Sequence, residues 1–366
     1  MISDKESALF NLIRIGLNRD EVQNNPLCKD LQSIKDIAFK QGVGNIVFDG
    51  IKKILLNDSE QKLSQNVDEH TLRMMEWFGY TNLSIRQYEQ NKKITEKLGS
   101  FYSLYDIPMM LLKGYGLSLN YPIPPHRPSG DVDIYLFGQW KKADILMSTD
   151  CGIVVDNSHH HHSVFQFEGQ SVENHYDFIN VHSHLSNIKI EKHFKKLAQE
   201  KGEEIFPNVY LPSPLLEVEF TVRHAAIHFA AGELTIRQIL DFILLAEKKH
   251  SQIDWGMFWS DAKMMGMDQF VQAIIDIAIS YLNFDDSKLR SSLPHNNEMA
   301  NKVLQDIFHP DYTGEKPNGF LLYTRWMIKR WWTNRWKHEI VYTDSLLSPF
   351  FVQMWSHLLK PSSLKN

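Results

Sequence analysis

The chain has 366 residues, of which 43% are hydrophobic and 23% charged, a composition typical of a packed globular protein with two or three domains. Its formal net charge of −5 argues against a protein whose whole surface binds nucleic acid, because such a surface requires an excess of basic residues. Two cysteines are too few for a disulfide framework, so we expect a reducing compartment.

The first residues reach the charged stretch 18–21 before any apolar run of signal-peptide length, so we expect no secretion signal. The apolar runs are broken by Lys, Glu or Asn before they reach the roughly 18 residues that cross a bilayer. These patterns predict a cytoplasmic protein without a transmembrane helix.

The region 1–100 is predicted to be a helical domain, because its apolar residues recur at helical spacing, as in Leu9, Leu12 and Ile13. One or two long amphipathic helices are expected over 69–101. The short apolar run 107–112 then ends at Lys113-Gly114, a pattern typical of a buried strand followed by a turn, and a helix is expected near residue 115.

The region 101–213 is predicted to be an α+β domain. A proline-rich loop at 121–130 leads into 131–136, which alternates like a strand and places Asp131 and Asp133 on one face. Further strands are expected at 152–155, 164–167 and 178–181, with a helix over 140–148. The region 214–366 returns to helical periodicity and is predicted to be a helical C-terminal domain.

Asp131 and Asp133 are the strongest candidates for catalysis and metal binding. Two carboxylates two residues apart on a strand repel each other, and a divalent cation, Mg²⁺ or Mn²⁺, is the usual compensation. An isolated Asp-x-Asp is more often a solvated turn. Here it follows Gly130, and Lys113, Gly114 and Arg127 stand upstream as candidates for nucleotide binding, which together suit nucleotidyl transfer.

This run of motifs resembles the polymerase-beta-like nucleotidyltransferase superfamily and, more narrowly, a bacterial family of uncharacterised nucleotidyltransferases. The resemblance rests on four motifs: Leu112-Lys113-Gly114, Tyr121-Pro122, Arg127 and Gly130-Asp131-Val132-Asp133. It implies a mixed sheet with helices, flanked by N-terminal and C-terminal helical regions. It also implies that Asp131 and Asp133 hold the metal and that Gly114 lines the triphosphate.

The resemblance further implies a third acidic residue on a later strand, usually just before a His. The stretch that we match to it is 179–182, where Asn180 stands in place of the acid and His182 follows. A neutral amide is a weak ligand and no base. Two hypotheses follow: an NTP-dependent, pyrophosphate-releasing nucleotidyltransferase, or a degenerate relative that binds a nucleotide or a partner without turnover.

The acceptor is not readable from the sequence. A small molecule, a sugar and a protein side chain all remain open, and the acidic balance makes a long nucleic acid the least attractive. A third hypothesis is dinucleotide binding through Gly114-Tyr115-Gly116, but Leu119 occupies the position of the third glycine.

Several other residues have a plain structural interpretation beside a functional one. The run His159–His162 is interpreted as a solvated loop, although a transition metal, or approach of His161 or His162 to the cleft, is an alternative. His224 and His228 have a zinc-binding spacing without the glutamate of a zinc protease. Arg237 and Asp241 are interpreted as an intrahelical ion pair, with an alternative role in ordering a nucleotide pocket.

The C-terminal run 325–337 mixes Arg and Lys with Trp. Stacking on bases or contact with a membrane surface is one interpretation. We favour packing, because Ile328, Trp332 and Trp336 share one helical face.

Overall fold

The computed structural model describes residues 2–22, 31–59, 67–289, 292–310 and 320–345. Cys28 lies outside these residues, as do 319 and the end of the tryptophan-rich tail, and Cys151 is exposed. None of the described helices combines the length and apolar character that a membrane-spanning segment requires.

Four helices precede the sheet: α1 (Asp4–Gly16), α2 (Leu31–Lys40), α3 (Gly44–Ser59) and α4 (Val67–Ser103). A capping box between Ser3 and Glu6 begins α1. Helices α1 and α3 pack with their backbones in close contact, because a Cβ on Gly50 would lie 2.2 Å from the carbonyl oxygen of Leu12. The predicted helical N-terminal region is therefore confirmed as helical.

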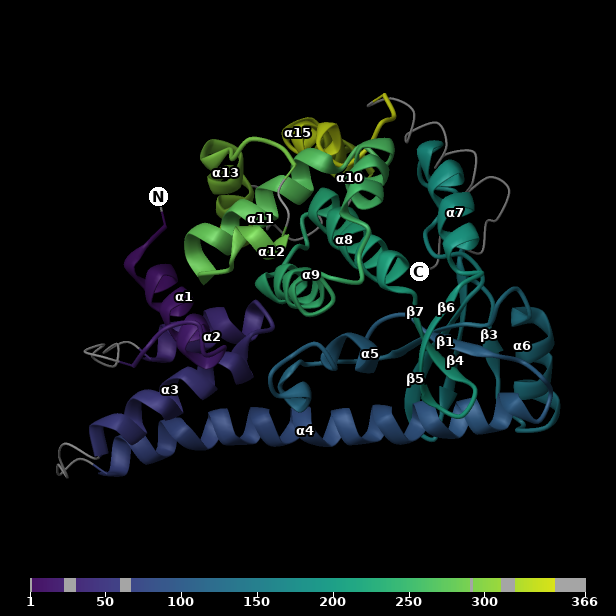
Figure 1. The fold of residues 1–366 in the computed structure, drawn as a ribbon, viewed down its shortest axis with the longest axis horizontal. Coiled ribbons are helices and arrows are strands. Elements are labelled where there is room, and N and C mark those ends of the chain that lie inside the picture. The colour runs from purple at the N-terminus through teal and green to yellow at the C-terminus, as the bar shows by residue number, and fades with distance from the viewer. Residues whose placement is uncertain (1, 23–30, 60–66, 290–291, 311–319, 346–366) are drawn as a thin grey trace.

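The long helix α4 runs along one side of the molecule, with α1 to α3 over one end and the sheet over the other (Figure 1). Trp77, near its first end, is buried among the N-terminal helices. Ile94, Leu98 and Tyr102, near its second end, are buried against the sheet. The helix thus changes its packing partner along its length.

The sheet of the described residues has seven strands in the order β3-β4-β5-β2-β1-β7-β6. The strands are β1 (Met109–Leu111), β2 (Val132–Tyr135), β3 (Val155–Asp156), β4 (His162–Phe167), β5 (Gln170–His175), β6 (Lys201–Phe206) and β7 (Val209–Pro212). It is a mixed sheet, because β2 pairs with β5 and β1 with β7 in parallel, whereas the other pairs are antiparallel. The short elements among the strands are α5 (Tyr115–Ser118), η1 (Pro124–His126), α6 (Trp140–Thr149) and α7 (Ser186–Leu197).

The two faces of the sheet have different roles. Val132, Ile134 and Val172 belong to a core that also contains the α4 side chains and residues of α6. Side chains alternate along a strand, so Asp133 and Glu173 project from the opposite face. That face is turned toward the C-terminal helices.

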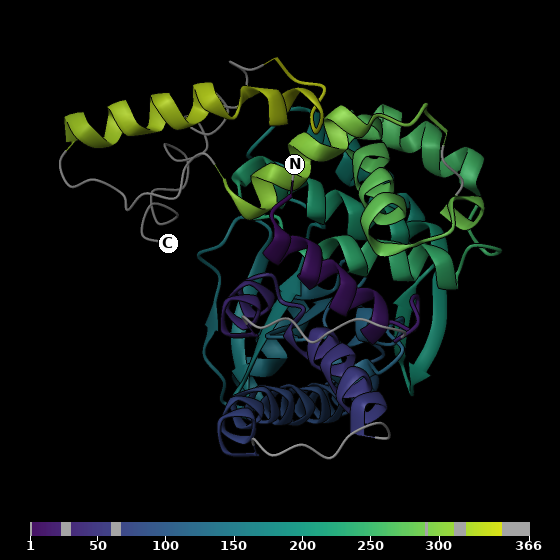
Figure 2. The ribbon, with the colours of Figure 1, turned by 90° about the vertical axis from the view of Figure 1, so that its left-hand side faces the viewer.

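The helices after the sheet begin with α8 (Pro214–Ala231), which has proline in its first turn and ends at Gly232 with φ 80°. The others are α9 (Ile236–Lys248), α10 (Trp255–Met264), α11 (Asp268–Leu282), α12 (Asp286–Leu289), α13 (Asn297–Phe308), α14 (Phe320–Thr333) and α15 (Arg335–Glu339). The apolar side chains of α8 to α13 and α15 share one core with those of α1 and α3, and α1 lies beside the C-terminal helices in both views (Figures 1 and 2).

The predicted fold class is confirmed, with a mixed sheet between two helical regions. The domain boundaries at 100/101 and 213/214 stay a prediction. Within the central region, the predicted strands at 107–112, 131–136 and 164–167 and the helix at 140–148 are present with shifted ends, and the strand predicted at 152–155 is reduced to β3. The sequence analysis did not identify β5, α7, β6 or β7.

The strand predicted at 178–181 is wrong. Phe178 and Ile179 are buried but belong to no strand, and Phe178 packs against Tyr135 of β2 and against Phe194 of α7. The Ile179 N–H donates to Glu191 Oε2 at 3.1 Å instead of to a neighbouring strand. Asn180 forms a local turn, because its Oδ1 accepts from the His182 N–H at 2.8 Å.

The packing predicted for the tryptophan run is correct only at Trp336, which lies against Phe229 at a ring distance of 5.3 Å. Ile328 and Trp332 are 61% and 58% exposed. They lie on α14, ahead of the turn at Asn334 that begins α15, so the continuous helical face assumed for the three residues is interrupted.

Replacement of Glu191 by Gln is expected to flatten the pH dependence of stability. Burial and the nearby Asp177 raise the pKa of Glu191 to about 7, from an unfolded value near 4.5. The raised pKa means that the folded protein favours the neutral carboxyl. The free energy of unfolding of the wild-type protein therefore falls by about 2 kcal/mol as the pH rises from the unfolded pKa to above the folded one. The Gln variant stays neutral and keeps an oxygen for the Ile179 N–H.

Urea unfolding at pH 5 and pH 8 measures this effect, with the exposed Glu200→Gln as the matched control. In the control, the free energy of unfolding should change between the two pH values by as much as in the wild type. The same change in Glu191→Gln as in the wild type would contradict the raised pKa of Glu191.

Candidate active site

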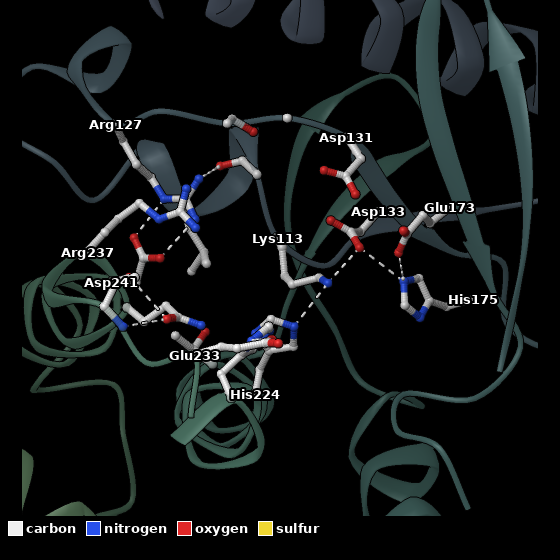
Figure 3. Close-up of a pocket in the computed structure, with 18 of the residues that line it drawn as sticks. Lys113, Arg127, Asp131, Asp133, Glu173, His175, His224, Glu233, Arg237 and Asp241 are labelled. Carbon is white, nitrogen blue, oxygen red and sulfur yellow. Dashed lines mark hydrogen bonds and ion pairs between the residues drawn. The ribbon is translucent and has the colours of Figure 1, made fainter. Parts of the chain in front are cut away.

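A cavity of about 520 Å³ lies between the polar face of the sheet and helices α8 and α9. Figure 3 shows two groups of side chains around it. Asp131, Asp133, Glu173 and His175 come from the sheet, whereas Arg237 and Asp241 come from α9. The cavity therefore depends on the packing of the C-terminal helices over the sheet.

The carboxylates of the sheet wall come from two paired strands. Asp133 on β2 and Glu173 on β5 are direct partners in the parallel register, so their side chains stand next to each other on the same face. Asp131, at the start of β2, also lines the cavity, with its carboxylate beside that of Asp133 (Figure 3). Three acidic side chains thus meet within a small part of the cavity wall.

Lys113 and His175 compensate the charge of Asp133. Lys113 Nζ lies 2.7 Å and His175 Nε2 3.1 Å from Asp133 Oδ1, and His175 Nε2 also lies 3.3 Å from Glu173 Oε2. Burial alone would raise the pKa of Asp133, but Lys113 and His175 outweigh it and hold the pKa well below its usual range. Burial lowers the pKa of Lys113, yet the ion pair with Asp133 keeps it above its usual value. Both groups of the ion pair are therefore charged.

Gly114 shapes the turn after β1. Its backbone has φ 59° and ψ −115°, a conformation that residues with a Cβ rarely adopt. A Cβ there would lie 3.0 Å from Ser129 Oγ and 3.1 Å from the Asp131 carbonyl oxygen. The Lys113-Gly114 turn and the strand that carries Asp131 can approach each other only because residue 114 is a glycine.

Arg127 joins this turn to α9. Its Nε and Nη2 donate to the two oxygens of Asp241 at 2.7 and 2.9 Å, and its Nη1 donates to the Gly114 carbonyl at 3.2 Å. Tyr121 OH also donates to Asp241, at 2.7 Å. Arg127 and Asp241 are buried, so this is a bidentate ion pair within the protein. Nucleotide binding was expected for Arg127, but this geometry favours a role in fixing the loop.

The intrahelical Arg237–Asp241 ion pair is a wrong prediction, because Asp241 is used by Arg127. Arg237 is half-buried, lines the cavity and donates from Nη1 to the Pro128 carbonyl at 3.3 Å. Its Nε is buried without a hydrogen-bond partner. Within the described part of the chain, the guanidinium is therefore a cation of the cavity wall that forms no ion pair with a carboxylate.

His224 and His228, on α8, also line the cavity. His224 Nε2 lies 3.4 Å from Lys113 Nζ, and burial together with Lys113 lowers the pKa of His224 well below its usual range. His228 Nδ1 lies 3.4 Å from the carboxylate of Glu233. The two histidines face the cavity.

The interpretation of His159–His162 as a solvated loop is wrong for its second half. His162 is the first residue of β4 and is only 8% exposed, and His161 is half-buried and lines the cavity. Burial and the neighbouring histidines lower the pKa of His161 to about 2. This imidazole is neutral at pH 7.

The cavity thus brings together most of the residues selected from the sequence: Lys113, Gly114, Arg127, Gly130, Asp131, Asp133, Arg237 and Asp241. Asn180 and His182 are not among the residues that line it. They follow β5 in a turn, rather than lying on a strand beside Asp133.

Glu173 and His175 are the site residues that the sequence analysis missed. The signal was present, because the resemblance implies an acidic residue shortly before a His on a later strand, and Glu173-Asn174-His175 has that form. The sequence analysis matched this pattern instead to the more apolar stretch at 179–182. The third carboxylate beside Asp131 and Asp133 therefore comes from Glu173, and not from position 180.

The donor set suits a divalent metal ion. One ligand atom from each of Asp133, Glu173 and His175 lies within 4.8 Å of the others. Carboxylate oxygens are the ligands that Mg²⁺ prefers, and Asp131, which also lines the cavity, adds a further carboxylate. Lys113 supplies positive charge next to these carboxylates.

A family model described as an uncharacterised nucleotidyltransferase matches residues 28–283, more than half of the chain. The chain therefore belongs to this family of uncharacterised nucleotidyltransferases. The matched range contains β1 to β7, the carboxylates and the Arg127–Asp241 ion pair. Neither the curated proteins nor the solved structures gave a significant match.

Arg127→Met is expected to destabilise the protein by about 3–5 kcal/mol, because it leaves the buried Asp241 without its cation. Adding Asp241→Asn should recover a large part of this loss, since the unpaired charge is removed. Urea unfolding of the single and double variants measures both changes. Arg237→Met is the matched control and should cost much less, because no carboxylate depends on it. A single variant within about 1 kcal/mol of the wild type would contradict a structural role for the pair.

Gly114→Ala is expected to lower stability by about 1–3 kcal/mol, because the added methyl group meets both a strained backbone and the strand at residue 131. Gly130→Ala is the control, since a Cβ there has no atom within 4 Å. Thermal unfolding of the two variants tests the difference. Similar melting temperatures would show that residue 114 tolerates a side chain.

Proposed function

We propose that this protein is a metal-dependent nucleotidyltransferase that moves a nucleoside monophosphate from an NTP to an acceptor hydroxyl. The observation that carries the proposal is the meeting of Asp131, Asp133 and Glu173 on one cavity wall, with Lys113 beside them and Arg237 across the cavity. This arrangement suits a substrate that carries both phosphates and a divalent cation.

In this proposal Asp131, Asp133 and Glu173 hold Mg²⁺ or Mn²⁺. The bound cation would supply charge neutralisation at the reacting phosphate and at the departing pyrophosphate. His175 would position the carboxylates, since its Nε2 lies within 3.3 Å of both Asp133 and Glu173. Family membership supports nucleotidyl transfer as the reaction class.

Lys113 and Arg237 are the proposed phosphate-binding cations. Lys113 is half-buried at the carboxylate wall, and Arg237 has donor capacity left over, because its Nε makes no hydrogen bond. The 3.4 Å approach of His224 to Lys113 helps to hold the ammonium in place. Arg127 acts indirectly, because it fixes Gly114 and α9 through Asp241.

Glu173 is the proposed proton acceptor. Its side chain is 23% exposed, compared with 6% for Asp133, so it is the more accessible of the two paired carboxylates. The acceptor oxygen would form a bond to the α-phosphorus, the bond from phosphorus to pyrophosphate would break, and the acceptor proton would pass to Glu173. Positioning and electrostatics would supply most of the rate.

Two other hypotheses have lost support. The degenerate binding protein rested on Asn180, which is outside the cavity, whereas Glu173 provides a carboxylate at the paired strand. Dinucleotide binding through Gly114-Tyr115-Gly116 needs glycines open to phosphate, but Gly116 is buried, and a Cβ there would lie 3.1 Å from the Leu211 side chain. The acceptor stays open among small molecules, sugars and proteins, and the proposed compartment is the cytoplasm.

The experiment is incubation of the full chain with each α-labelled NTP and Mg²⁺ or Mn²⁺, with candidate acceptors, followed by detection of labelled product and pyrophosphate. Asp131→Asn and Glu173→Gln should each lower turnover by about 100-fold or more. Calorimetric titration with NTP should show metal-dependent binding that Asp131→Asn weakens.

Asn180→Ala and His182→Ala are the matched controls, because the sequence suggested these residues but the cavity does not include them. They should keep wild-type turnover. Metal-dependent NTP binding with no pyrophosphate under any condition would favour the degenerate hypothesis over the proposed enzyme. Unchanged turnover in Asp131→Asn and Glu173→Gln would overturn the proposed site.

A further inference from the structure

Three histidines form a cluster at the edge of the cavity, next to the carboxylates. His162 on β4 and His175 on β5 are direct partners in the antiparallel register, so their side chains share the face that carries Glu173. His161 precedes β4 and lines the cavity. One ring nitrogen from each of His161, His162 and His175 lies within 4.8 Å of those of the other two.

Two of these imidazoles have hydrogen-bonding capacity that the protein does not use. The Nδ1 atoms of His161 and His162 are buried and make no hydrogen bond. An unpaired polar atom in the interior destabilises the folded protein, because it has lost its hydrogen bonds with water. His162 is more than nine-tenths buried, at 8% exposure, and its Nε2 lies 3.9 Å from Glu173 Oε1. A bound metal ion would give these buried nitrogens a partner.

The backbone holds the cluster in place. The carbonyl of His161 accepts hydrogen bonds from the N–H groups of Tyr176 and Asp177, both at 3.1 Å. These two residues directly follow His175, so the segments on either side of the cluster are tied together. His162 and His175 are fixed by the β4–β5 ladder. His162 and His175 are therefore placed by paired strands, and His161 is placed by the backbone hydrogen bonds of its carbonyl next to β4.

We propose that His161, His162 and His175 bind one transition-metal ion, of which Zn²⁺ is the best candidate. Neutral imidazole is a preferred ligand of Zn²⁺ and a poor one for Mg²⁺, so this site differs in chemistry from the oxygen-rich group at Asp131 and Asp133. Three protein ligands leave a coordination position open, and His161 is on the cavity wall. The open position would accept an oxygen of a phosphate or hydroxyl in the cavity.

The nitrogens must move closer for this ligation. With metal–nitrogen distances of about 2.0–2.1 Å, the nitrogens of a tetrahedral site are separated by roughly 3.4 Å. The separation of up to 4.8 Å is therefore larger by an amount that small changes of side-chain rotamer would cover. The proposal does not require nucleotidyl transfer, although His175 is common to both groups.

The test uses full-length protein without a tag, purified without metal-affinity resin and treated with EDTA. Zn²⁺ is titrated in competition with a chromophoric chelator, and Co²⁺ is titrated by visible absorption, which reports a low-coordinate nitrogen site. The wild type should bind one tight equivalent. His161→Ala/His162→Ala should lose at least about 100-fold in affinity.

His159→Ala is the matched control, because it shortens the same histidine run without removing a member of the cluster. It should stay within about threefold of the wild type. His162→Gln, with circular dichroism and a melting curve, serves as a second ligand variant if the double variant does not fold. Equal loss in His159→Ala and the cluster variants would mean adventitious binding by a histidine-rich segment and would overturn the site, as would a wild type without a tight equivalent.

Failure of this site and failure of the proposed function have separate signatures. NTP titrations with Mg²⁺ on the same variants report the function, whereas the Zn²⁺ stoichiometry reports the cluster. If Asp131→Asn keeps both the zinc equivalent and NTP binding, the histidine site stands and the proposed nucleotide site does not. If His161→Ala/His162→Ala keeps the zinc equivalent, the histidine proposal alone is wrong.

Discussion

The structure depends most on the placement of like charges on directly paired strands. Asp133 and Glu173 face each other across the β2–β5 ladder, and such a pair is unfavourable unless cations stand nearby. Lys113 reaches them from the end of β1 and His175 from β5 itself. The result is a band of polar side chains across the middle strands of the sheet, from His162 on β4 to Lys113 after β1. A sheet with apolar residues on both faces would have no such charges to compensate.

A second charge pair connects this sheet to the rest of the molecule. Arg127 and Asp241 lie 114 residues apart and form the bidentate contact that orients the Gly114 turn toward α9. The N-terminal helices take part as well, because Asn45 donates to the His126 carbonyl and Asp49 contacts the His126 ring. The loop before β2 is thus held from both helical regions.

The sequence was informative where local periodicity and site chemistry agree. Asp131 and Asp133 alternate with apolar Val132 and Ile134, so both the strand and its polar face could be predicted. β5 has no such pattern, because its core-facing residues include polar side chains: Asn174 Nδ2 donates to Asp144 and Gln170 Nε2 donates to the Gly130 carbonyl. Its polar residues are stabilised by partners that are distant in the sequence, and Glu173 was missed for this reason.

The errors at Asn180 and Asp241 have a related cause. Phe178 and Ile179 have the apolar character of a strand, but they are buried without pairing with another strand, and Phe178 packs against Tyr135 of β2 and Phe194 of α7. Arg237 and Asp241 have the spacing of a helical ion pair, but a nearer and better donor arrives from the loop at 127. Local spacing predicts which contacts are available, whereas the tertiary structure decides which of the competing contacts forms.

The division of the cavity wall between the sheet and α9 also affects how the site comes into existence. A chain synthesised only as far as β7 has Asp131, Asp133 and Glu173, but it lacks Arg237, and Arg127 has no counter-ion. Strand pairing alone therefore cannot complete the cavity. The cavity wall is complete only after α8 and α9 have been synthesised and have packed over the sheet.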